Sequence, residues 1–599
     1  MENAERRTQG LRRASFCILH LSFSLDAARA FRKWRREMPG SIPPSSPAPV
    51  VAGRAQFVRV LGLRDVVAMN VVAVVALRWI PRAARLGAPS LVLWALAWLT
   101  FFLPLAGAVS ELSSRYPQQG GIYVWARRAF GPTHGFICGW CLWVNNIFYF
   151  ASFLLFAAAN ALLVFGPRFE TLATSRLYSV VFVLVTLWLC VGLNVVGLGT
   201  SKWLHNLGSL AVWGPAALLI GCGAVAFAWF GSATSFAASE LVPRGDAWST
   251  LGLWSAICFA FSGFEITSLV GQEVKRPTRT IPLGVLIAGI MATIIYAAGS
   301  ASVLVAIPAS AIHERSGIAD VVDMVSARIG LGGLGALTGG LLALGAIAAT
   351  SSWFAGAGRV PFAAGADGML PAALTRIHPR FHSPHVALLV QGLGATLIFF
   401  VSLFLTVTGS TNSIQEAYDI LVNLAILLYF VPYLYLFASL VKLRADDSAE
   451  RGSNLADVEP SFSRRRGGAS APPTRAGLKP GPCDDGEEHS RPWHAETPEM
   501  ASIPSTASAP SGASAAFAVS ALNEHLIHVP GGRVGGWVTA GAGFLATAVS
   551  LALVFVPPPG TTSAINYEVN LVGQTVALMV LGLAVYSRYR RPARRLEPR

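Results

Sequence analysis

A carboxylate in an apolar stretch is the side chain of this sequence best suited to chemistry away from water. Glu265 ends the run Phe259-Ala-Phe-Ser-Gly-Phe-Glu265. Placing an ionisable group in hydrocarbon costs free energy, and such groups mark ion and substrate paths in membranes. Ser262 and Gly263 favour local unwinding of a helix. We therefore expect Glu265 to act in coupling, substrate binding or gating. The alternative is a protonated, hydrogen-bonded carboxyl group at a helix interface.

Three further polar groups lie within apolar stretches, and each has a functional and a structural interpretation. Asn145 and Asn146 could line a pore, although asparagine in membranes also links helices. The hydroxyls of residues 350–352 could ligate sodium, but hydroxyls in helices usually bond to their own backbone. Arg78 and Trp79 are expected to anchor a helix at the outer membrane interface, with an anionic substrate facing Arg78 as the alternative.

The scattered cysteines and the lack of a nucleotide-binding motif give little support for a cofactor. Seven cysteines are scattered along the chain, so no disulfide framework is predicted. Cys138 and Cys141 have CxxC spacing, but in an apolar helix we expect them to pack as small hydrophobic residues. The sequence has no P-loop and no clustered nucleophile or His/Asp/Glu set in its apolar stretches. We therefore predict no cofactor, no metal site and no enzymatic activity.

The composition indicates that lipid surrounds most of the chain. The 599 residues are 53% hydrophobic and 13% charged, with a mean hydropathy of +0.53, which is more apolar than a soluble core requires. A helix crosses a bilayer with ~20 apolar residues, and the sequence offers about twelve such segments. They are 63–80, 89–112, 133–165, 177–196, 203–230, 249–271, 282–307, 331–356, 385–407, 417–440, 533–556 and 570–585.

The charges are arranged as expected for a protein of the cell membrane with both termini in the cytoplasm. The formal net charge of +15 comes from Lys and Arg beside the apolar segments and in the tails. This is not one basic face, so nucleic acid is not an expected partner. Alternate connections are richer in Lys and Arg, and the positive-inside rule places that side in the cytoplasm.

Five regions follow from these patterns. Residues 1–60 are expected to form a disordered basic cytoplasmic tail, with Met38 as an alternative start, and residues 61–443 a ten-helix core. Residues 444–530 are rich in Ser, Pro, Ala, Arg and Glu, so we expect a disordered cytoplasmic loop that is dispensable for function. Two more membrane helices are expected at 531–588 and a basic tail at 589–599.

Three motifs occur in order along the chain. The first is Glu111–Trp125, which reads ELSSRYPQQGGIYVW and is followed by Ala129-Phe-Gly-Pro132. The second is FSGFE at 261–265 with QEVKRPTRTIP at 272–282. The third is RVPF at 359–362 with ADGMLP at 366–371 and HPR at 378–380. Together they resemble the amino acid, polyamine and organocation (APC) superfamily of permeases, over most of residues 61–444.

The resemblance implies an all-α membrane fold of two inverted five-helix repeats, like that of the leucine transporter, plus two C-terminal helices. The first and sixth spans would be broken around the substrate. The implied substrate-binding residues are Val74, Val75, Ala76, Phe259, Phe261, Ser262 and Gly263, with Phe259 as a gating aromatic. The first span departs from the family pattern, since no glycine lies between Gly62 and Gly87. This widens the expected substrates to polyamines and other amines.

The function implied by the resemblance is secondary-active transport of amino acids or related amines and polyamines by alternating access. Glu265 would be the switchable charge, and a proton or a sodium ion the candidate co-ion. The fifth span lacks the lysine through which some family members couple to protons. Two alternatives stay open: an exchanger that swaps one amine or amino acid for another, and a membrane sensor that binds the same ligands without moving them.

Overall fold

The computed structural model describes residues 57–590 except 167–168, 170–171, 173–174, 244–246, 313–316, 408–413, 464–528 and 556–563. The chain divides into two units, Met1–Ala55 and Gln56–Arg599. The first unit, with nearly all of the expected N-terminal tail, lies outside the described residues, as do most of the expected loop and the C-terminal tail. All elements named below belong to the second unit.

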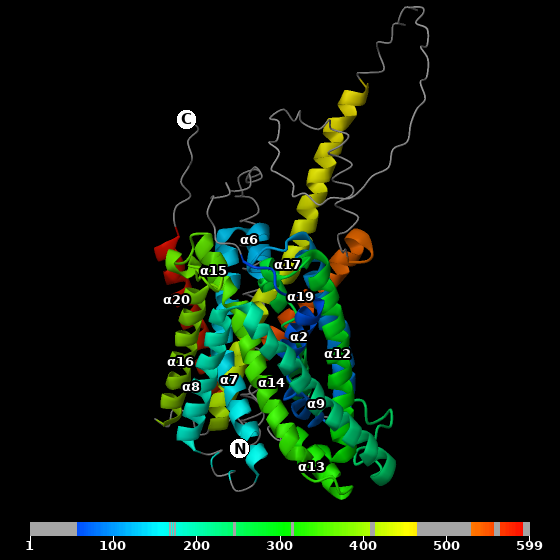
Figure 1. The fold of residues 1–599 in the computed structure, drawn as a ribbon. Helices are drawn as coiled ribbons and strands as arrows, with labels where there is room; N and C mark the ends of the chain where they lie inside the picture. Colours follow the sequence, from blue (N-terminus) through cyan, green and yellow to red (C-terminus); the bar gives the residue numbers. More distant parts are fainter. Residues whose placement is uncertain are drawn as a thin grey trace, which may run out of the picture. The chain divides into compact units, whose positions relative to one another are not determined.

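The second unit is built from helices, many of which run side by side (Figure 1). The helices at the predicted spans are α2 (Leu63–Val74) with α3 (Trp79–Ala84), α4 (Pro89–Ala97) continuing through η1 (Trp98–Phe102) into α5 (Leu103–Arg115), α7 (Pro132–Leu162), α8 (Arg176–Val196), α9 (Leu198–Phe230), α10 (Ala247–Ala260) with α11 (Ile266–Leu269), α12 (Pro277–Ala306), α14 (Leu334–Ala357), α16 (His385–Val407), α17 (Ile414–Ser463), α19 (Gly532–Leu553) and α20 (Ala564–Tyr589). Helices α6 (Ile122–Phe130), α13 (Gly317–Arg328) and α15 (Arg359–Ala366) lie outside the predicted spans.

The lengths and composition of these helices confirm an all-α membrane protein. Within the described ranges, nine helices are long and apolar enough to cross a bilayer. Two shorter apolar segments, Thr250–Ala260 and His385–Val401, lie in α10 and α16. The first predicted span forms α2 and α3. Each predicted span therefore coincides with helical structure, and the two that were expected to be broken are broken.

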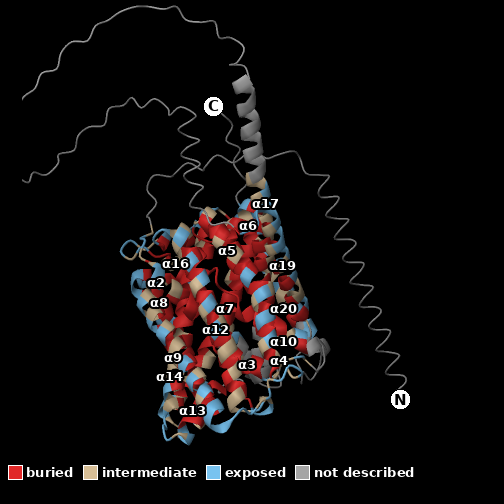
Figure 2. Cartoon of the chain, turned by 90° about the vertical axis from the view of Figure 1, so that its right-hand side faces the viewer, coloured by how far each residue is buried: buried red, intermediate tan, exposed pale blue. Residues whose placement is uncertain are grey.

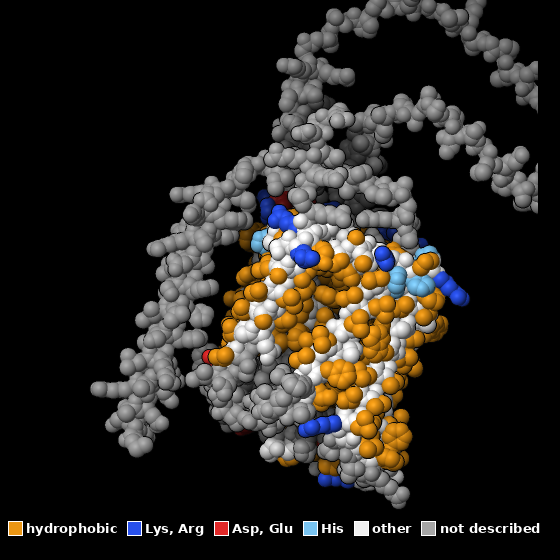
Figure 3. Space-filling model, turned by 90° about the vertical axis from the view of Figure 1, so that its left-hand side faces the viewer, with side chains coloured by type: hydrophobic (Ala, Val, Ile, Leu, Met, Phe, Trp, Pro, Cys, Tyr) orange, Lys and Arg blue, Asp and Glu red, His pale blue; other side chains and the backbone are white. Residues whose placement is uncertain are grey.

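The outer wall of the bundle is apolar. Leu177 is 74% exposed, Trp203 70% and Leu210 67%. Figure 3 shows one side of the molecule, where hydrophobic side chains cover the wall and Lys and Arg lie near its two ends. Such exposure would cost about 25 cal/mol per Å² of apolar surface in water. In a bilayer it costs little, so the wall is suited to contact lipid tails.

The interior of the bundle forms around α2. Helix α2 packs against α9, α12 and α14, and α14 packs against α7; Figure 2 shows buried residues inside and exposed ones outside. Gly208 of α9 allows close approach, because a Cβ there would lie 2.1 Å from the Cβ of Ala348 and 2.8 Å from Val72. Small residues at such crossings let helices pack tightly where lipid gives no hydrophobic driving force.

Helix α17 continues to Ser463, well inside the range expected to be a loop. Its extension packs onto the end of the membrane core through Glu111, which is fully buried. Arg444 donates to Glu111 from Nε at 2.6 Å, and Arg115 lies 2.9 Å from the same carboxylate. Val529 N, on the far side of the undescribed segment, donates to Glu111 at 2.8 Å. One carboxylate thus contacts both Arg444 within α17 and the backbone three residues before α19.

We predict that Glu111→Gln destabilises the protein by about 3 kcal/mol, because it leaves two largely buried arginines without the charge that they share. The measurement is the unfolding transition of the purified protein in detergent. Lys442→Gln is the matched control, since Lys442 forms an exposed pair with Asp446 on α17 at 2.8 Å, and exposed pairs contribute little. Equal transitions for the two variants would contradict this role of Glu111.

Candidate functional site

The first span is interrupted at residues 75–78 although it contains no glycine there. Val75 has φ −74° and ψ 77°, close to an inverse γ-turn at about −75° and 65°. Consistent with that turn, Ala76 N donates to Val74 O at 2.7 Å. The turn has a negative φ, which any L-residue can adopt. The implied break is therefore present, and it forms without the glycines typical of the family.

The sixth span is interrupted between Ala260 and Ile266, which confirms the unwinding predicted at Ser262-Gly263. Gly263 has φ +108°, a conformation that residues with a Cβ rarely adopt. A Cβ at this position would also lie 2.8 Å from the ring of Trp353. Glycine is thus required here both by the backbone and by the close approach of α14.

The hydroxyl of Tyr296 on α12 connects the two interruptions. Its oxygen lies 2.9 Å from Val74 O and 3.1 Å from Ala260 O, so one proton is shared between carbonyls of both spans. The same oxygen accepts from Ala76 N at 3.2 Å. At the sixth span, the hydroxyl of Tyr433 accepts from Gly263 N at 2.6 Å. These bonds stabilise both breaks, because an unsatisfied backbone group in hydrocarbon costs several kcal/mol.

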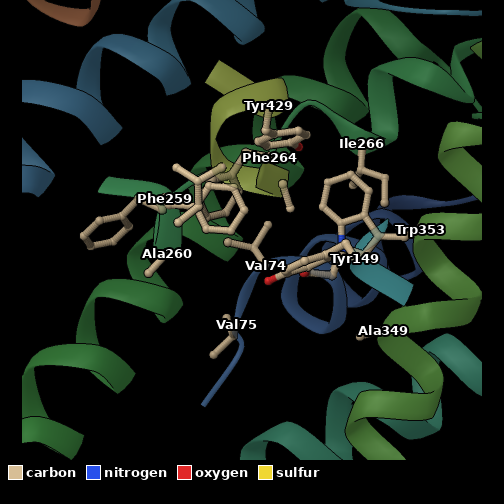
Figure 4. Packing of buried hydrophobic residues seen from close by; sticks show 14 of the residues in the cluster. Val74, Val75, Tyr149, Phe259, Ala260, Phe264, Ile266, Ala349, Trp353 and Tyr429 are labelled. Carbon is tan, nitrogen blue, oxygen red and sulfur yellow. The ribbon is translucent and has the colours of Figure 1, made fainter. Parts of the chain in front are cut away.

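A small cavity lies where the broken spans meet α7, α14 and α17. It is lined by Ala73, Val74, Trp79, Asn145, Asn146, Tyr149, Phe259, Ala260, Ser262, Trp353 and Tyr429. Figure 4 shows Val74, Tyr149, Phe259, Trp353 and Tyr429 grouped in this region. A second cavity on the other side of the first-span break is lined by residues of α2, α7, α9 and α14. Each has room for about one water molecule, so a larger ligand must displace side chains.

Phe259 lies at the centre of the aromatic side chains around the first cavity. Its ring centroid is 5.7 Å from that of Trp79, 5.8 Å from that of Tyr149 and 5.7 Å from that of Tyr429, all in edge-to-face contact. Such contacts are favourable but individually weak, at about 0.5–1.5 kcal/mol.

Glu265 is fully buried at the start of α11 and does not line either cavity. The hydroxyl of Tyr429 donates to one carboxylate oxygen, and that of Tyr433 donates to the other at 2.7 Å. Tyr429 also lines the first cavity. The Tyr429 side chain therefore lies between the Glu265 carboxyl group and the cavity, and contacts both.

The structure divides the substrate-binding residues implied by the resemblance into three groups. Val74, Phe259 and Ser262 line the first cavity, and Val75 and Ala76 line the second. Phe261 and Gly263 line neither. Phe261 packs against Trp94, Phe102 and Tyr296, and Gly263 provides the turn.

Sequence reasoning missed the aromatic side chains that α14 and α17 contribute to the site. Trp353 lines the first cavity, and its Nε1 donates to Ala73 O at 3.0 Å. Tyr429 and Tyr433 hold Glu265. Their spacing of four residues places two hydroxyls on one face of a helix in an apolar span. This spacing was the signal that could have identified the two tyrosines, but it does not indicate that their hydroxyls bond to Glu265.

The two asparagines of α7 and the hydroxyls of residues 350–352 differ in their hydrogen-bond partners. Asn146 Nδ2 donates to Leu142 O at 2.7 Å, whereas the amide oxygens of Asn145 and Asn146 accept no hydrogen bond from the described residues. Thr350 bonds to its own helix at Ala346 O, at 2.9 Å. Ser351 accepts from Asn194 at 3.0 Å. The expectation that these hydroxyls bond to their own helix therefore fits Thr350, whereas the Ser351 hydroxyl contacts Asn194 of α8 and the Ser352 hydroxyl donates to Met69 O of α2 at 3.3 Å.

The expected interface anchor, Arg78-Trp79, is not at the surface. Arg78 is 7% exposed and Trp79 5% exposed, and each lines one of the two cavities. The short α3 follows the break at once, which draws both residues into the bundle instead of ending a continuous helix at the membrane surface. Cys138 and Cys141 are buried and contact Ile122 O and Met579, as expected for packing residues.

Comparison with known proteins gives consistent results. A family model described as "Amino acid permease" matches residues 61–456. An uncharacterized transporter of Legionella pneumophila is 30% identical over 390 residues, which are 64% of this chain and 81% of that protein. Two proteins of Lactococcus lactis are 26% identical. One, named a probable agmatine/putrescine antiporter, aligns over 61% of this chain and 75% of its own length; the other, a glutamate/gamma-aminobutyrate antiporter, over 57% and 67%.

We predict that Tyr296→Phe destabilises the protein by about 2 kcal/mol or more, because it removes the hydroxyl that bonds to a carbonyl of each break and leaves Ala76 N and Val74 O with only each other as partners. The unfolding transition in detergent measures this loss. Tyr178→Phe is the matched control, since Tyr178 donates to the single carbonyl of Ala158, at 2.8 Å. If Tyr296→Phe shifts the transition no further than the control does, Tyr296 does not stabilise the two breaks.

Proposed function

Because this chain belongs to the amino acid permease family, we propose that it is a secondary-active permease that moves amino acids or related amines by alternating access. The observation that carries the proposal is the first cavity, which is bounded by the two broken spans and by α7, α14 and α17. Its lining is mostly aromatic and aliphatic with a few polar groups, as in small-molecule sites. A site at the meeting point of interrupted helices is also typical of alternating-access transporters.

We further propose that Glu265 couples transport to a proton. Tyr429 both donates to the Glu265 carboxylate and lines the cavity, so a change in the position of Tyr429 would change the hydrogen bonds that Glu265 accepts. Opening the cavity to water would move both groups to a wetter environment, in which the ionised carboxylate is favoured. Ligand entry and proton exchange would then act on the same pair of side chains.

Exchange is the second candidate function. Two relatives are named as antiporters, one for agmatine and putrescine and one for glutamate and gamma-aminobutyrate. An antiporter needs the same cavity and the same alternation between inward-open and outward-open states, but its empty form does not reorient, so it must bind a second ligand before it returns. A ligand sensor would need the cavity without the alternation. The proposed location is the cell membrane, with both termini in the cytoplasm.

We predict that Glu265→Gln, which mimics a permanently protonated group, abolishes uphill uptake into proteoliposomes but preserves exchange between preloaded ligand pools. Without a titrating group the carrier equilibrates its ligand and cannot accumulate it. Glu568→Gln is the control, because Glu568 is exposed on α20 outside the buried site. Surface expression and ligand binding are measured on the same preparation.

Normal accumulation by a well-inserted Glu265→Gln variant would end the coupling proposal and leave Glu265 as a packing group. A wild-type protein that binds ligands in detergent but transports none in either assay would instead favour the sensor. A wild-type protein that moves ligand only against a preloaded pool would favour the antiporter.

A further inference from the structure

The side-chain amide of Asn146 on α7 has a fixed orientation. Its Nδ2 donates to Leu142 O, one turn earlier in the same helix, at 2.7 Å. Only the nitrogen of an amide can donate, so Oδ1 is the atom that remains for other contacts. This oxygen is buried and accepts no hydrogen bond from the described residues. A buried polar atom without a partner is costly, and its presence in a native protein calls for an explanation.

The position of Asn146 distinguishes it from Asn160 on the same helix. Asn160 Nδ2 donates to Phe156 O at 2.9 Å, and its Oδ1 also has no partner in the described part of the chain. Asn160 lines neither cavity. Asn146 lines the first cavity together with Asn145, whose Oδ1 is likewise buried and accepts no bond within the described ranges. The cavity therefore offers a ligand two amide oxygens, and Asn160 provides an internal comparison.

Three other polar side chains of the first cavity already donate their protons to the protein. The hydroxyl of Ser262 donates to Phe259 O at 2.6 Å, and that of Tyr429 donates to Glu265. Trp353 Nε1 donates to a carbonyl of α2 at 3.0 Å. The two hydroxyl oxygens can thus offer lone pairs to a ligand but no proton. Like the asparagine oxygens, they suit a group that brings its own hydrogen-bond donors.

The surroundings of these acceptors also suit a positive charge. Figure 4 shows Tyr149, Phe259 and Trp353 around the first cavity, and the faces of aromatic rings attract cations. Within the described ranges no charged side chain lines this cavity. Glu265 and Arg78 each contact an aromatic residue of the lining, so their opposite charges lie one side chain away. An ammonium group, with a positive charge and only donors, matches this environment.

We infer that Asn146 is a specificity-determining residue which, together with Asn145, accepts hydrogen bonds from an ammonium group of the ligand. This inference rests on the proposed transport function and adds the group by which the site selects its ligands. A similar molecule that lacks the ammonium group leaves the buried oxygens without a partner. Sites built to bond to an N–H group of a substrate reject such analogues.

The test compares ligands that differ by one ammonium group. Binding to the purified full-length protein in detergent is measured for L-phenylalanine and hydrocinnamate, L-glutamate and glutarate, γ-aminobutyrate and butanoate, and putrescine and butylamine. For the pairs that bind, the wild type should prefer the member with the additional ammonium group by about tenfold or more. Asn146→Leu, which keeps the size of the side chain but has no acceptor, should bring this ratio about tenfold closer to unity.

Two further variants show whether the lost acceptor is the cause. Asn160→Leu is the matched control and should keep the wild-type ratio, because Asn160 lines neither cavity. Asn146→Asp should keep the preference or increase it, since a carboxyl oxygen replaces the amide oxygen as acceptor. If Asn146→Leu does not fold, Asn146→Ala takes its place, and its ratio should fall in the same way.

The outcomes separate this inference from the function on which it rests. A folded Asn146→Leu variant with the wild-type ratio overturns the inference and keeps the permease proposal. So does an equal change in Asn160→Leu, or a loss of the preference in Asn146→Asp. The measurements are made with and without sodium, and an effect of Asn146→Leu that occurs only with sodium would assign the oxygens to that ion and overturn the inference. Binding of none of the ligands, extended to the other α-amino acids, overturns both proposals.

Discussion

The main constraint on this molecule is that a helix broken within a bilayer must find hydrogen-bond partners for the main-chain groups that it frees. Hydrocarbon offers no such partners, and two spans of this chain are broken. Tyr296 and Tyr433 provide partners from neighbouring helices. The hydroxyl of Tyr296 contacts both breaks, so the two broken spans are tied to one point of α12. The position of α12 relative to α2 and α10 is therefore linked to the geometry of the site.

This constraint also explains the composition of the site. The partners of the freed backbone groups are tyrosines, and Trp353 donates to the carbonyl of Ala73 in the same region. Aromatic side chains with a polar end can fill space and satisfy the backbone at once. Tyr433 then serves twice, since it accepts from Gly263 N and donates to Glu265. The buried carboxylate is thus joined to the sixth-span break by one hydroxyl. A movement of either group would change the hydrogen bonds of the other.

Much of the fold was predictable, because hydrocarbon imposes a length and a composition on each span. The break at Gly263 was also predictable, since a serine and a glycine precede a buried carboxylate. The first-span break could be predicted only from the family resemblance. Val75 forms an inverse γ-turn, which needs no glycine and so gives no local signal in the sequence. The burial of Arg78 was not predicted, since a charge near the end of an apolar run usually marks the membrane surface. The tyrosines of α17 were missed because their partner, Glu265, lies far away in the sequence.

The proposed transport function requires that the ligand binds between the two broken spans. The most direct measurement is alkylation of a cysteine introduced at Ser262, which lines the first cavity, in a variant whose native cysteines are replaced. The account predicts that the amino acid with the highest affinity slows alkylation of Ser262→Cys and leaves that of Ser232→Cys, at an exposed position, unchanged. Equal alkylation rates of Ser262→Cys with and without a saturating ligand would contradict it.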